Sequence, residues 1–183
     1  LISNPDDKGI ARSYNQGAEI ANGNYILFMN CYSLLTEKCL SSMLKCMQNE
    51  DNCAIVGPVS NNVSGYQNIQ IPYKDINQLN DFVRQNRDYN LGAAKQVFRI
   101  LSHCMLIKKE AIEKIGNFDE RFGLGTYEDD DFCLRAINYS YSLYIALDAF
   151  VYYINPFSLP DADSDSYFKR LRENRQKAID KWG

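Results

Sequence analysis

The chain has 183 residues, of which 45% are hydrophobic and 23% are charged, and this composition fits one globular domain with a real core. Its formal net charge of −3 argues against a duplex nucleic-acid partner, which would require a basic face. No apolar run approaches the roughly 20 residues that span a bilayer. The sequence begins with Leu1 rather than Met, and its first residues do not have the pattern of a signal peptide. We therefore expect an excised piece of a cytoplasmic protein.

Six cysteines and one histidine limit the metal chemistry of the chain. Cys39, Cys46 and Cys53 are seven residues apart, but no Cys-x-x-Cys pair occurs and several cysteines have apolar neighbours. We interpret all six as reduced thiols of the core. The single histidine, His103, excludes a site built from several histidines.

Helices and strands are expected to alternate through the first half of the chain. An apolar stripe ending at Gly23 predicts a helix over 10–22. Residues 25–29 form a continuous apolar run, typical of a strand covered on both faces, and 30–33 form the loop at its end. Thr36 is expected to cap the next helix. The apolar stripe of that helix is Leu40, Met43, Leu44 and Met47.

A second strand, a polar segment and a helix are expected next. Residues 53–56 predict a short buried strand that Gly57 and Pro58 would end. The polar segment extends to residue 74, and a helix is expected over 75–86. Its inward residues are expected to be Ile76, Leu79 and Phe82.

The second half of the chain continues this alternation. We expect a strand over 100–107 and a helix over 109–115 that ends at Gly116. A glycine-rich loop over 123–126 leads into a helix that begins with four carboxylates. The remaining expected elements are strands over 143–146 and 149–154, a loop over 156–164 and a helix over 165–182. The inner face of the last helix is expected to hold Phe168, Leu171, Arg175, Ala178 and Trp182. Strands that alternate with helices indicate an α/β fold, with the strands over 25–29, 53–56 and 100–107 at its centre.

The four consecutive carboxylates, Glu128 to Asp131, have two interpretations. An acidic first turn favours a helix, because its dipole stabilises each negative charge by roughly 0.3–1 kcal/mol. Alternatively, a carboxylate held at a helix start beneath a flexible loop can act as a general base. Crowding of the carboxylates would raise the pKa of one of them.

Two further segments are candidate binding sites. Asn30-Cys31-Tyr32 follows a strand, where open α/β sheets bind ligands, but the segment holds no carboxylate for a metal. Residues 60–67 offer amides, hydroxyls and Tyr66, which suit a carbohydrate or a nucleotide but equally suit a surface turn. The basic residues of the last helix could contact phosphates or an anionic membrane surface, or form a solvated face.

Four motifs, in this order, resemble those of the family-two glycosyltransferases. The first is the Asn-, Gly- and Ala-rich stretch that ends in Tyr25-Ile26, in which Asp7 replaces one Asn. The second is Val56-Gly57-Pro58 with the Ser/Asn-rich turn after it. The third is the strand 105–109, followed by Ile-Gly-Asn-Phe-Asp-Glu-Arg-Phe over 115–122. The fourth is Glu-Asp-Asp-Asp-Phe-Cys-Leu-Arg over 128–135.

This resemblance implies a GT-A fold, a mixed sheet flanked by helices, and an inverting transfer of a hexosyl or hexosaminyl group. The donor would be a nucleotide sugar, and the acceptor a carbohydrate, as in polysaccharide biosynthesis, or a protein. Asp129 would be the catalytic base, and Glu128 and Asp131 would position its turn and tune its charge. Donor and acceptor contacts are expected from Arg12, Asn30, Tyr32, Asn61 and Gly125. The catalytic domain would cover 1–160, and an amphipathic helix with possible membrane contact would cover 161–183.

The sequence departs from the family pattern in three ways. The family's divalent metal, Mn or Mg, normally bridges the donor diphosphate, but its Asp position is occupied by Tyr32 and its His positions by Tyr152 and Tyr153. We therefore assign no metal ligand and expect Arg12 or Lys108 to balance the phosphate charge. The chain is also expected to be N-terminally truncated and to lack the first nucleotide-binding unit. A catalytically degenerate carbohydrate-binding or interaction module is the alternative function, and a nucleotidylyltransferase would share the architecture.

Overall fold

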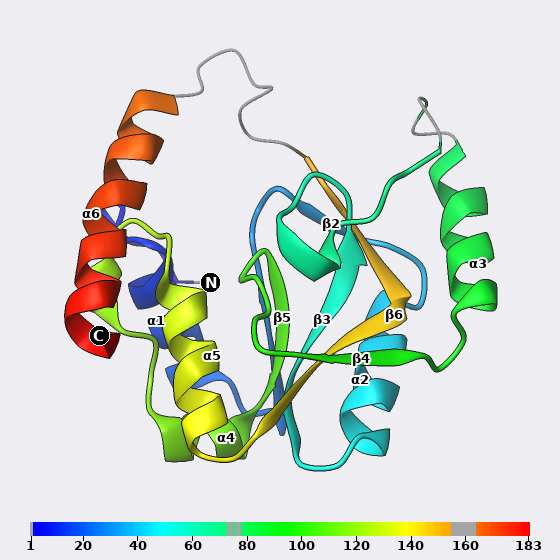
Figure 1. The fold of residues 1–183 in the computed structure, drawn as a ribbon, viewed down its shortest axis with the longest axis horizontal. Coiled ribbons are helices and arrows are strands. Elements are labelled where there is room, and N and C mark those ends of the chain that lie inside the picture. Colours follow the sequence, from blue (N-terminus) through cyan, green and yellow to red (C-terminus); the bar gives the residue numbers. More distant parts are fainter. Residues whose placement is uncertain (1, 73–74, 76–77, 155–163) are drawn as a thin grey trace.

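A computed structural model of the chain describes residues 2–72, 75, 78–154 and 164–183 (Figure 1). Its α-helices are α1 (Ile10–Ile20), α2 (Cys39–Asn49), α3 (Leu79–Tyr89), α4 (Lys109–Ile115), α5 (Glu128–Asn138) and α6 (Ser164–Trp182). Its strands are β1 (Tyr25–Met29), β2 (Ser33–Leu35), β3 (Cys53–Ser60), β4 (Ala94–Val97), β5 (Cys104–Lys108) and β6 (Ser142–Tyr153).

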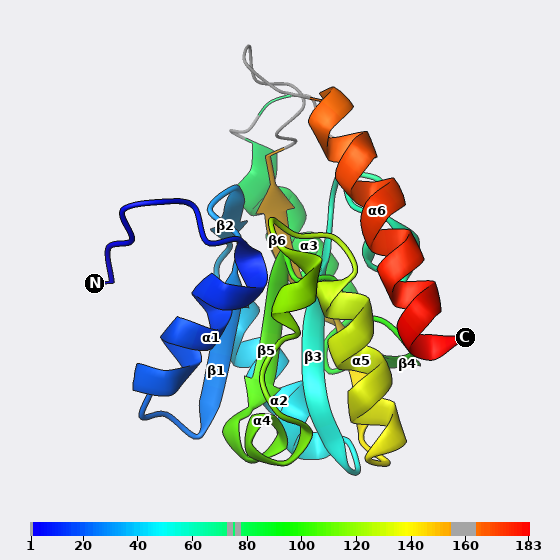
Figure 2. The same cartoon turned by 90° about the vertical axis from the view of Figure 1, so that its left-hand side faces the viewer.

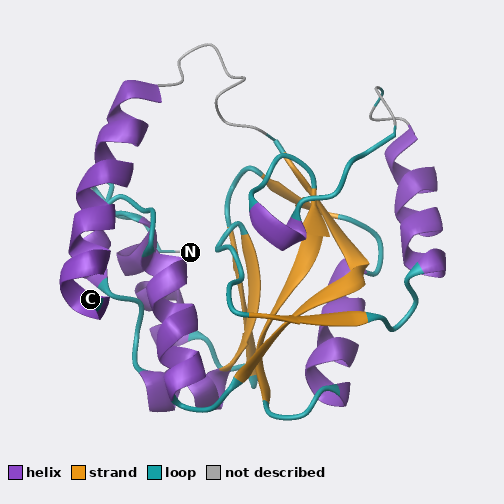
Figure 3. Cartoon of the chain, viewed as in Figure 1, coloured by secondary structure: helices purple, strands orange, loops and turns teal. Residues whose placement is uncertain are grey.

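The strands form one mixed sheet in the order β1-β5-β3-β6-β2, and β4 also pairs with β6 (Figure 3). β5 runs antiparallel to both β1 and β3, whereas β3 and β6 are parallel. The ends of β1, β3 and β6 therefore meet the start of β5 at one edge of the sheet. We call this the site edge, and it comprises residues 30–32, 60–61, 102–103 and 152–153.

Helices cover both faces of the sheet (Figure 2). Buried side chains of α1, α4 and α5 share one core cluster with Phe28, Ile55 and Met105 of the strands. The opposite cluster joins α2 to Val56 and Leu106. Successive residues of β5 thus enter different clusters, and so do Ile55 and Val56 of β3. All residues of β3 are buried, as expected for a strand covered on both sides. The predicted mixed α/β architecture, with helices on both faces of the sheet, is confirmed.

The expected order of the strands needs one correction. β3 and β5 are central, but β1 lies at the end of the described sheet and contacts only β5 there. Its side chains accordingly alternate between buried and partly or fully exposed, with Ile26 and Phe28 buried. The apolar run over 25–29 was correctly predicted as a strand but wrongly placed at the centre.

Several predicted boundaries are also wrong. Gly57 and Pro58 do not end β3, because they pair with β6 up to a register shift between Pro58 and Val59. This irregularity lies where proline cannot donate a ladder hydrogen bond. At the same place β6 bulges over 147–149, so the two strands expected around Asp148 are one bent strand.

The segment over 94–107 was also misread. The strand expected over 100–107 begins only at Cys104, and the sequence analysis missed β4 altogether. β4 has only four residues, with two polar ones between Ala94 and Val97, so it shows no apolar alternation.

Three expectations about helices are corrected too. Thr36 does not cap α2; its hydroxyl donates to the carbonyl oxygen of Phe150, and Lys38 precedes the helix in a left-handed conformation. α3 begins at Leu79 rather than at residue 75, while Ile76 and the loop over 155–163 lie outside the described residues. On α6 the most deeply buried side chain is Asn174, which is 2% exposed, whereas Phe168 is 52% exposed.

Candidate active site

The acidic turn begins at a sharp bend at the site-edge end of α5. Thr126 and Tyr127 have φ angles of 76° and 69°, a left-handed conformation that costs side-chain-bearing residues roughly 1–3 kcal/mol each. The bend turns the loop over 123–125 into α5 within two residues. Glu128, Asp129 and Asp131 are thereby buried in the first turn of the helix.

Ser102, just before β5, binds two of the four carboxylates. Its hydroxyl donates to Oε1 of Glu128 at 2.9 Å, and its backbone N–H donates to Oδ2 of Asp129 at 3.0 Å. Its carbonyl oxygen accepts a hydrogen bond from the hydroxyl of Tyr14 at 2.8 Å. Ser102 thus joins the sheet, α1 and α5. The sequence analysis missed Ser102 and Tyr14, because neither belongs to a recognisable acidic or glycine-rich pattern.

Asp129 is held by backbone donors on both of its oxygens. Oδ2 accepts the Ser102 N–H, and Oδ1 accepts the Asp130 N–H at 2.9 Å. Asp129 is only 6% exposed. Hydrogen bonds from fixed backbone donors hold the carboxyl group in one orientation.

Burial and mutual repulsion make two neighbouring carboxyl groups weaker acids. Glu128 is 2% exposed, and its Oε2 has no hydrogen-bond partner among the described residues. Burial first, and then the charge of Asp129, raise the pKa of Glu128 to about 7. The same two causes raise the pKa of Asp130 to about 6, although Arg99 forms an ion pair with it at 2.6 Å. The turn therefore changes its charge within the neutral pH range.

Asp131 faces the last helix rather than the site edge. Its carboxylate accepts hydrogen bonds from Arg135 at 2.9 Å and from the Trp182 indole at 3.0 Å, and Lys181 lies 2.6 Å away. Arg135 also donates to the carbonyl oxygens of Ile115 and Asn117. Asp131 therefore joins α5, α6 and the end of α4.

α6 also binds the loop that precedes the acidic turn. The buried amide of Asn174 donates to the carbonyl oxygens of Phe122 and Gly125, each at 2.7 Å. Lys177 donates to the carbonyl oxygen of Arg121, and Lys181 to the carboxylate of Asp119. Sequence reasoning missed Asn174, because one polar residue inside a helical stripe is usually assigned to the surface.

The predicted strand-end residues come together at the site edge, largely in contacts with backbone. Oδ1 of Asn30 accepts the Tyr32 N–H at 2.9 Å, and the Asn30 N–H donates to the carbonyl oxygen of His103. The Asn61 amide is 2% exposed and pairs with both backbone groups of Tyr153, at 2.8 and 3.0 Å. The backbone N–H of Asn30 thus joins the end of β1 to the segment before β5, and the side-chain amide of Asn61 joins the end of β3 to β6.

Of the remaining predicted contacts, Gly125 belongs to the loop before the acidic turn, Arg12 to α1 and Lys108 to the end of β5. Arg12 is exposed in the first turn of α1. Gly125 has a φ of 117°, and a Cβ atom there would lie 2.8 Å from Cδ1 of Ile10, so glycine is required where the loop meets α1. Lys108 ends β5 opposite Tyr25 at the far edge of the sheet, so the suggestion that it balances phosphate charge is wrong.

The three tyrosines at the positions that the resemblance assigns to metal contacts lie on two paired segments, β6 and the residues around β2. β2 pairs Ser33 with Tyr153 and Leu34 with Tyr152, and the carbonyl oxygen of Tyr32 accepts the Ile154 N–H at 2.9 Å. Hard divalent cations prefer carboxylate oxygens, so these phenols do not fit one. In the part of the chain that the structure describes, no three His, Cys, Asp or Glu side chains form a possible metal site.

His103 lies next to one of these tyrosines, Tyr153. Its ring centroid is 5.6 Å from that of Tyr153, and neither ring nitrogen has a hydrogen-bond partner among the described residues. Burial lowers the pKa of His103 to about 4, so the ring is neutral at physiological pH.

Comparison with known proteins supports the fold and the family. The family described as "Glycosyltransferase like family 2" matches residues 2–170. Among solved structures, GalNAc-T7 with UDP, GalNAc and Mn²⁺ is similar, with a TM-score of 0.63 and 9% sequence identity. The match covers 84% of this chain and 32% of that chain, so this chain corresponds to about a third of its length. No curated protein matched the sequence. Within the described residues, no helix is both long and apolar enough to cross a bilayer.

Proposed function

The chain belongs to the glycosyltransferase-like family 2, and from that premise we propose that it forms the acceptor side of an inverting glycosyltransferase. The enzyme would transfer a hexosyl or hexosaminyl group from a nucleotide sugar to an acceptor hydroxyl, as in polysaccharide biosynthesis. The family and the GT-A-like fold support glycosyl transfer. The arrangement of the acidic turn supports the assignment of roles within it.

Asp129 is the catalytic base in this proposal. The acceptor oxygen attacks the anomeric carbon while its proton passes to the Asp129 carboxylate. The bond from that carbon to the donor phosphate breaks, and the nucleoside diphosphate leaves with the bonding electrons. The supporting observation is the pair of backbone N–H groups, from Ser102 and Asp130, that hold the two oxygens of Asp129. A base that is oriented in advance loses little entropy when the acceptor binds.

Glu128 and Asp131 position this base from opposite sides. Glu128 shares Ser102 with Asp129, so the two carboxyl groups are held by one residue of the sheet. Asp131 binds the end of α6 through Lys181 and Trp182. Near neutral pH, a protonated Glu128 would reduce the repulsion on Asp129.

The donor phosphates would be bound without the family's usual metal contacts. Tyr32 and Tyr153 can donate phenolic hydrogen bonds to phosphate oxygens. Arg12, on the first turn of α1, is an exposed cation for the same anion. Asn30 and Asn61, whose amides bind backbone, would shape this edge rather than bind the donor directly.

Replacement of Asp129 in the protein that contains this chain tests the assignment. Asp129→Asn keeps the shape of the side chain and one of its two backbone hydrogen bonds, and it should lower the rate of sugar transfer by about 10²–10⁴-fold, the range for general-base catalysis. Asp130→Asn is the matched control, because Asp130 pairs with Arg99 and should affect the rate less. Full turnover by Asp129→Asn would show that another group is the base.

A catalytically degenerate carbohydrate-binding module is the second candidate. Tyr32, Tyr152 and Tyr153 favour it, because they occupy the positions that the resemblance assigns to metal contacts. Absence of both transfer and donor hydrolysis with common nucleotide sugars would support this candidate. Cytoplasmic localisation and membrane contact by α6 stay predictions. Two basic residues of α6, Lys177 and Lys181, bind the domain itself.

A further inference from the structure

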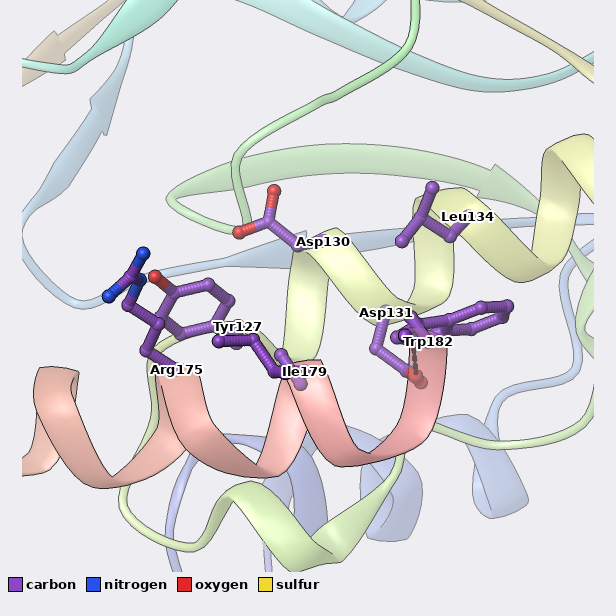
Figure 4. A pocket seen from close by; sticks show the side chains of 9 residues that line it. Tyr127, Asp130, Asp131, Leu134, Arg175, Ile179 and Trp182 are labelled. Carbon is purple, nitrogen blue, oxygen red and sulfur yellow. Dashed lines mark hydrogen bonds between the residues drawn. The ribbon is translucent and has the colours of Figure 1, made fainter.

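A pocket of about 300 Å³ lies between α5 and α6, beside the acidic turn (Figure 4). α5 and the residue before it contribute Tyr127, Asp130 and Leu134, and α6 contributes Arg175, Ile179 and Trp182. This volume is at the lower end of the range for small-ligand sites, so the pocket suits one small ring rather than a large cofactor.

The walls of the pocket are apolar and partly exposed. Leu134 is 40% exposed, Ile179 is 44% exposed and Trp182 is 36% exposed. The indole N–H of Trp182 donates to Asp131, which orients the ring. Two aromatic side chains and two aliphatic ones thus surround a hollow that is open to solvent (Figure 4).

Three charged groups line this pocket: Asp130, Asp131 and Arg175. Asp131 is already bonded to Arg135, Lys181 and Trp182. Asp130 is already paired with Arg99, at 2.6 Å. Arg175 forms no ion pair or hydrogen bond with any residue in the described ranges, and its side chain lies beside the Tyr127 ring (Figure 4). Its guanidinium is therefore free to donate to a ligand.

We propose that this pocket binds a sugar unit of a carbohydrate acceptor. A sugar ring has apolar C–H faces that pack against aromatic rings, here Trp182 and Tyr127, and hydroxyl groups around its rim. Arg175 can donate to those hydroxyls. Apolar walls with few polar groups at the rim match this combination.

The position of the pocket indicates which sugar unit it holds. Asp130 follows the proposed base directly, and Leu134 lies one turn further along α5. The pocket therefore extends away from Asp129, and it would hold a unit adjacent to the one whose hydroxyl reacts. This acceptor role rests on the proposed function, whereas sugar binding by the pocket does not.

Trp182 is the only tryptophan of the chain, so its fluorescence reports on this pocket alone. The experiment titrates the whole chain with methyl glycosides of glucose, galactose, N-acetylglucosamine and glucuronic acid, with selective excitation of tryptophan. We expect at least one of them to change the emission saturably. Arg175→Ala should weaken that binding roughly fivefold, the factor for a net hydrogen bond of about 1 kcal/mol. Arg172→Ala, an exposed arginine on the same helix outside the pocket, should leave binding unchanged.

The outcomes separate this proposal from the proposed function. Emission that none of the four glycosides changes would overturn the pocket proposal, even if the protein transfers sugar. Equal weakening by Arg175→Ala and Arg172→Ala would also overturn it. Saturable binding that only Arg175→Ala weakens would support the pocket, even if transfer and donor hydrolysis were absent and the catalytic proposal failed.

Discussion

The side-chain amide of Asn174 donates a 2.7 Å hydrogen bond to the carbonyl oxygen of Gly125, and thereby joins the last helix to the loop before the acidic turn. The same amide donates to the carbonyl oxygen of Phe122, also at 2.7 Å. Because Asn174 is 2% exposed, water cannot replace these bonds without a local rearrangement. The position of α6 and the conformation of the loop are therefore coupled.

Asn174→Ala should destabilise the domain and loosen this loop. The substitution leaves two buried carbonyl oxygens without their donor, which costs about 1–3 kcal/mol in the free energy of unfolding. Urea denaturation measures that loss, and hydrogen exchange should increase over 121–127. Gln176→Ala is the control, since exposed Gln176 bonds only to Asp180 on its own helix. Equal effects of the two substitutions would contradict a specific role for Asn174.

Glu128 should make the domain less stable as the pH rises through the neutral range. Because burial raises its pKa from the ordinary 4.5 to about 7, the folded state binds more protons than the unfolded state between these values. Its protonation therefore contributes stability below about pH 4.5, and that contribution is lost as the pH rises to about 7. Glu128→Gln should remove this decline and stabilise the protein above pH 7 by roughly 1–3 kcal/mol.

Denaturation curves at several pH values measure this effect, with Glu113→Gln as a surface control because Glu113 is exposed on α4. If the two variants showed the same pH dependence as the unchanged chain, burial of Glu128 would not be its cause.

The chain alone should bind manganese or magnesium weakly or not at all. Tyr32, Tyr152 and Tyr153 offer phenols where a hard cation prefers carboxylates. Isothermal titration calorimetry of the chain with MnCl₂ and with MgCl₂ measures this. Micromolar binding that persists in Tyr32→Ala would reveal a metal site elsewhere in the chain.

Thiol titration should distinguish Cys31 from the other cysteines. Cys31 is exposed, whereas Cys39, Cys46, Cys53, Cys104 and Cys133 are buried and all six are free. Burial raises the pKa of each buried thiol, so little reactive thiolate forms there. An aromatic disulfide reagent should therefore modify one cysteine in the native protein and six in denaturant. Cys31→Ser should abolish the native reaction; rapid modification of a second thiol would contradict the burial pattern.

Local sequence patterns were sufficient to predict a helix or strand where neighbouring residues determine the backbone conformation. β1 was predicted over its full length from one apolar run, and α4 was predicted from its start to Gly116, which has a φ of 88°. The acidic motif and the Ile-Gly-Asn-Phe-Asp-Glu segment indicated the family. Residues 2–170 do match that family. The order of these motifs, together with helix and strand periodicity, thus led to the α/β architecture.

Tertiary structure alone determined the partners of the buried polar groups. Nothing local marks Ser102 as the residue that binds both Glu128 and Asp129, because these partners are 26 and 27 residues away in sequence. From the sequence alone Asn174 is assigned to the surface, because its partner Gly125 lies 49 residues earlier in the chain. The sequence pattern likewise predicts that β3 ends at Pro58, but pairing with β6 extends the strand beyond this residue. Burial makes each of these polar groups require a partner, and that partner is set by the packing of distant segments rather than by sequence neighbours.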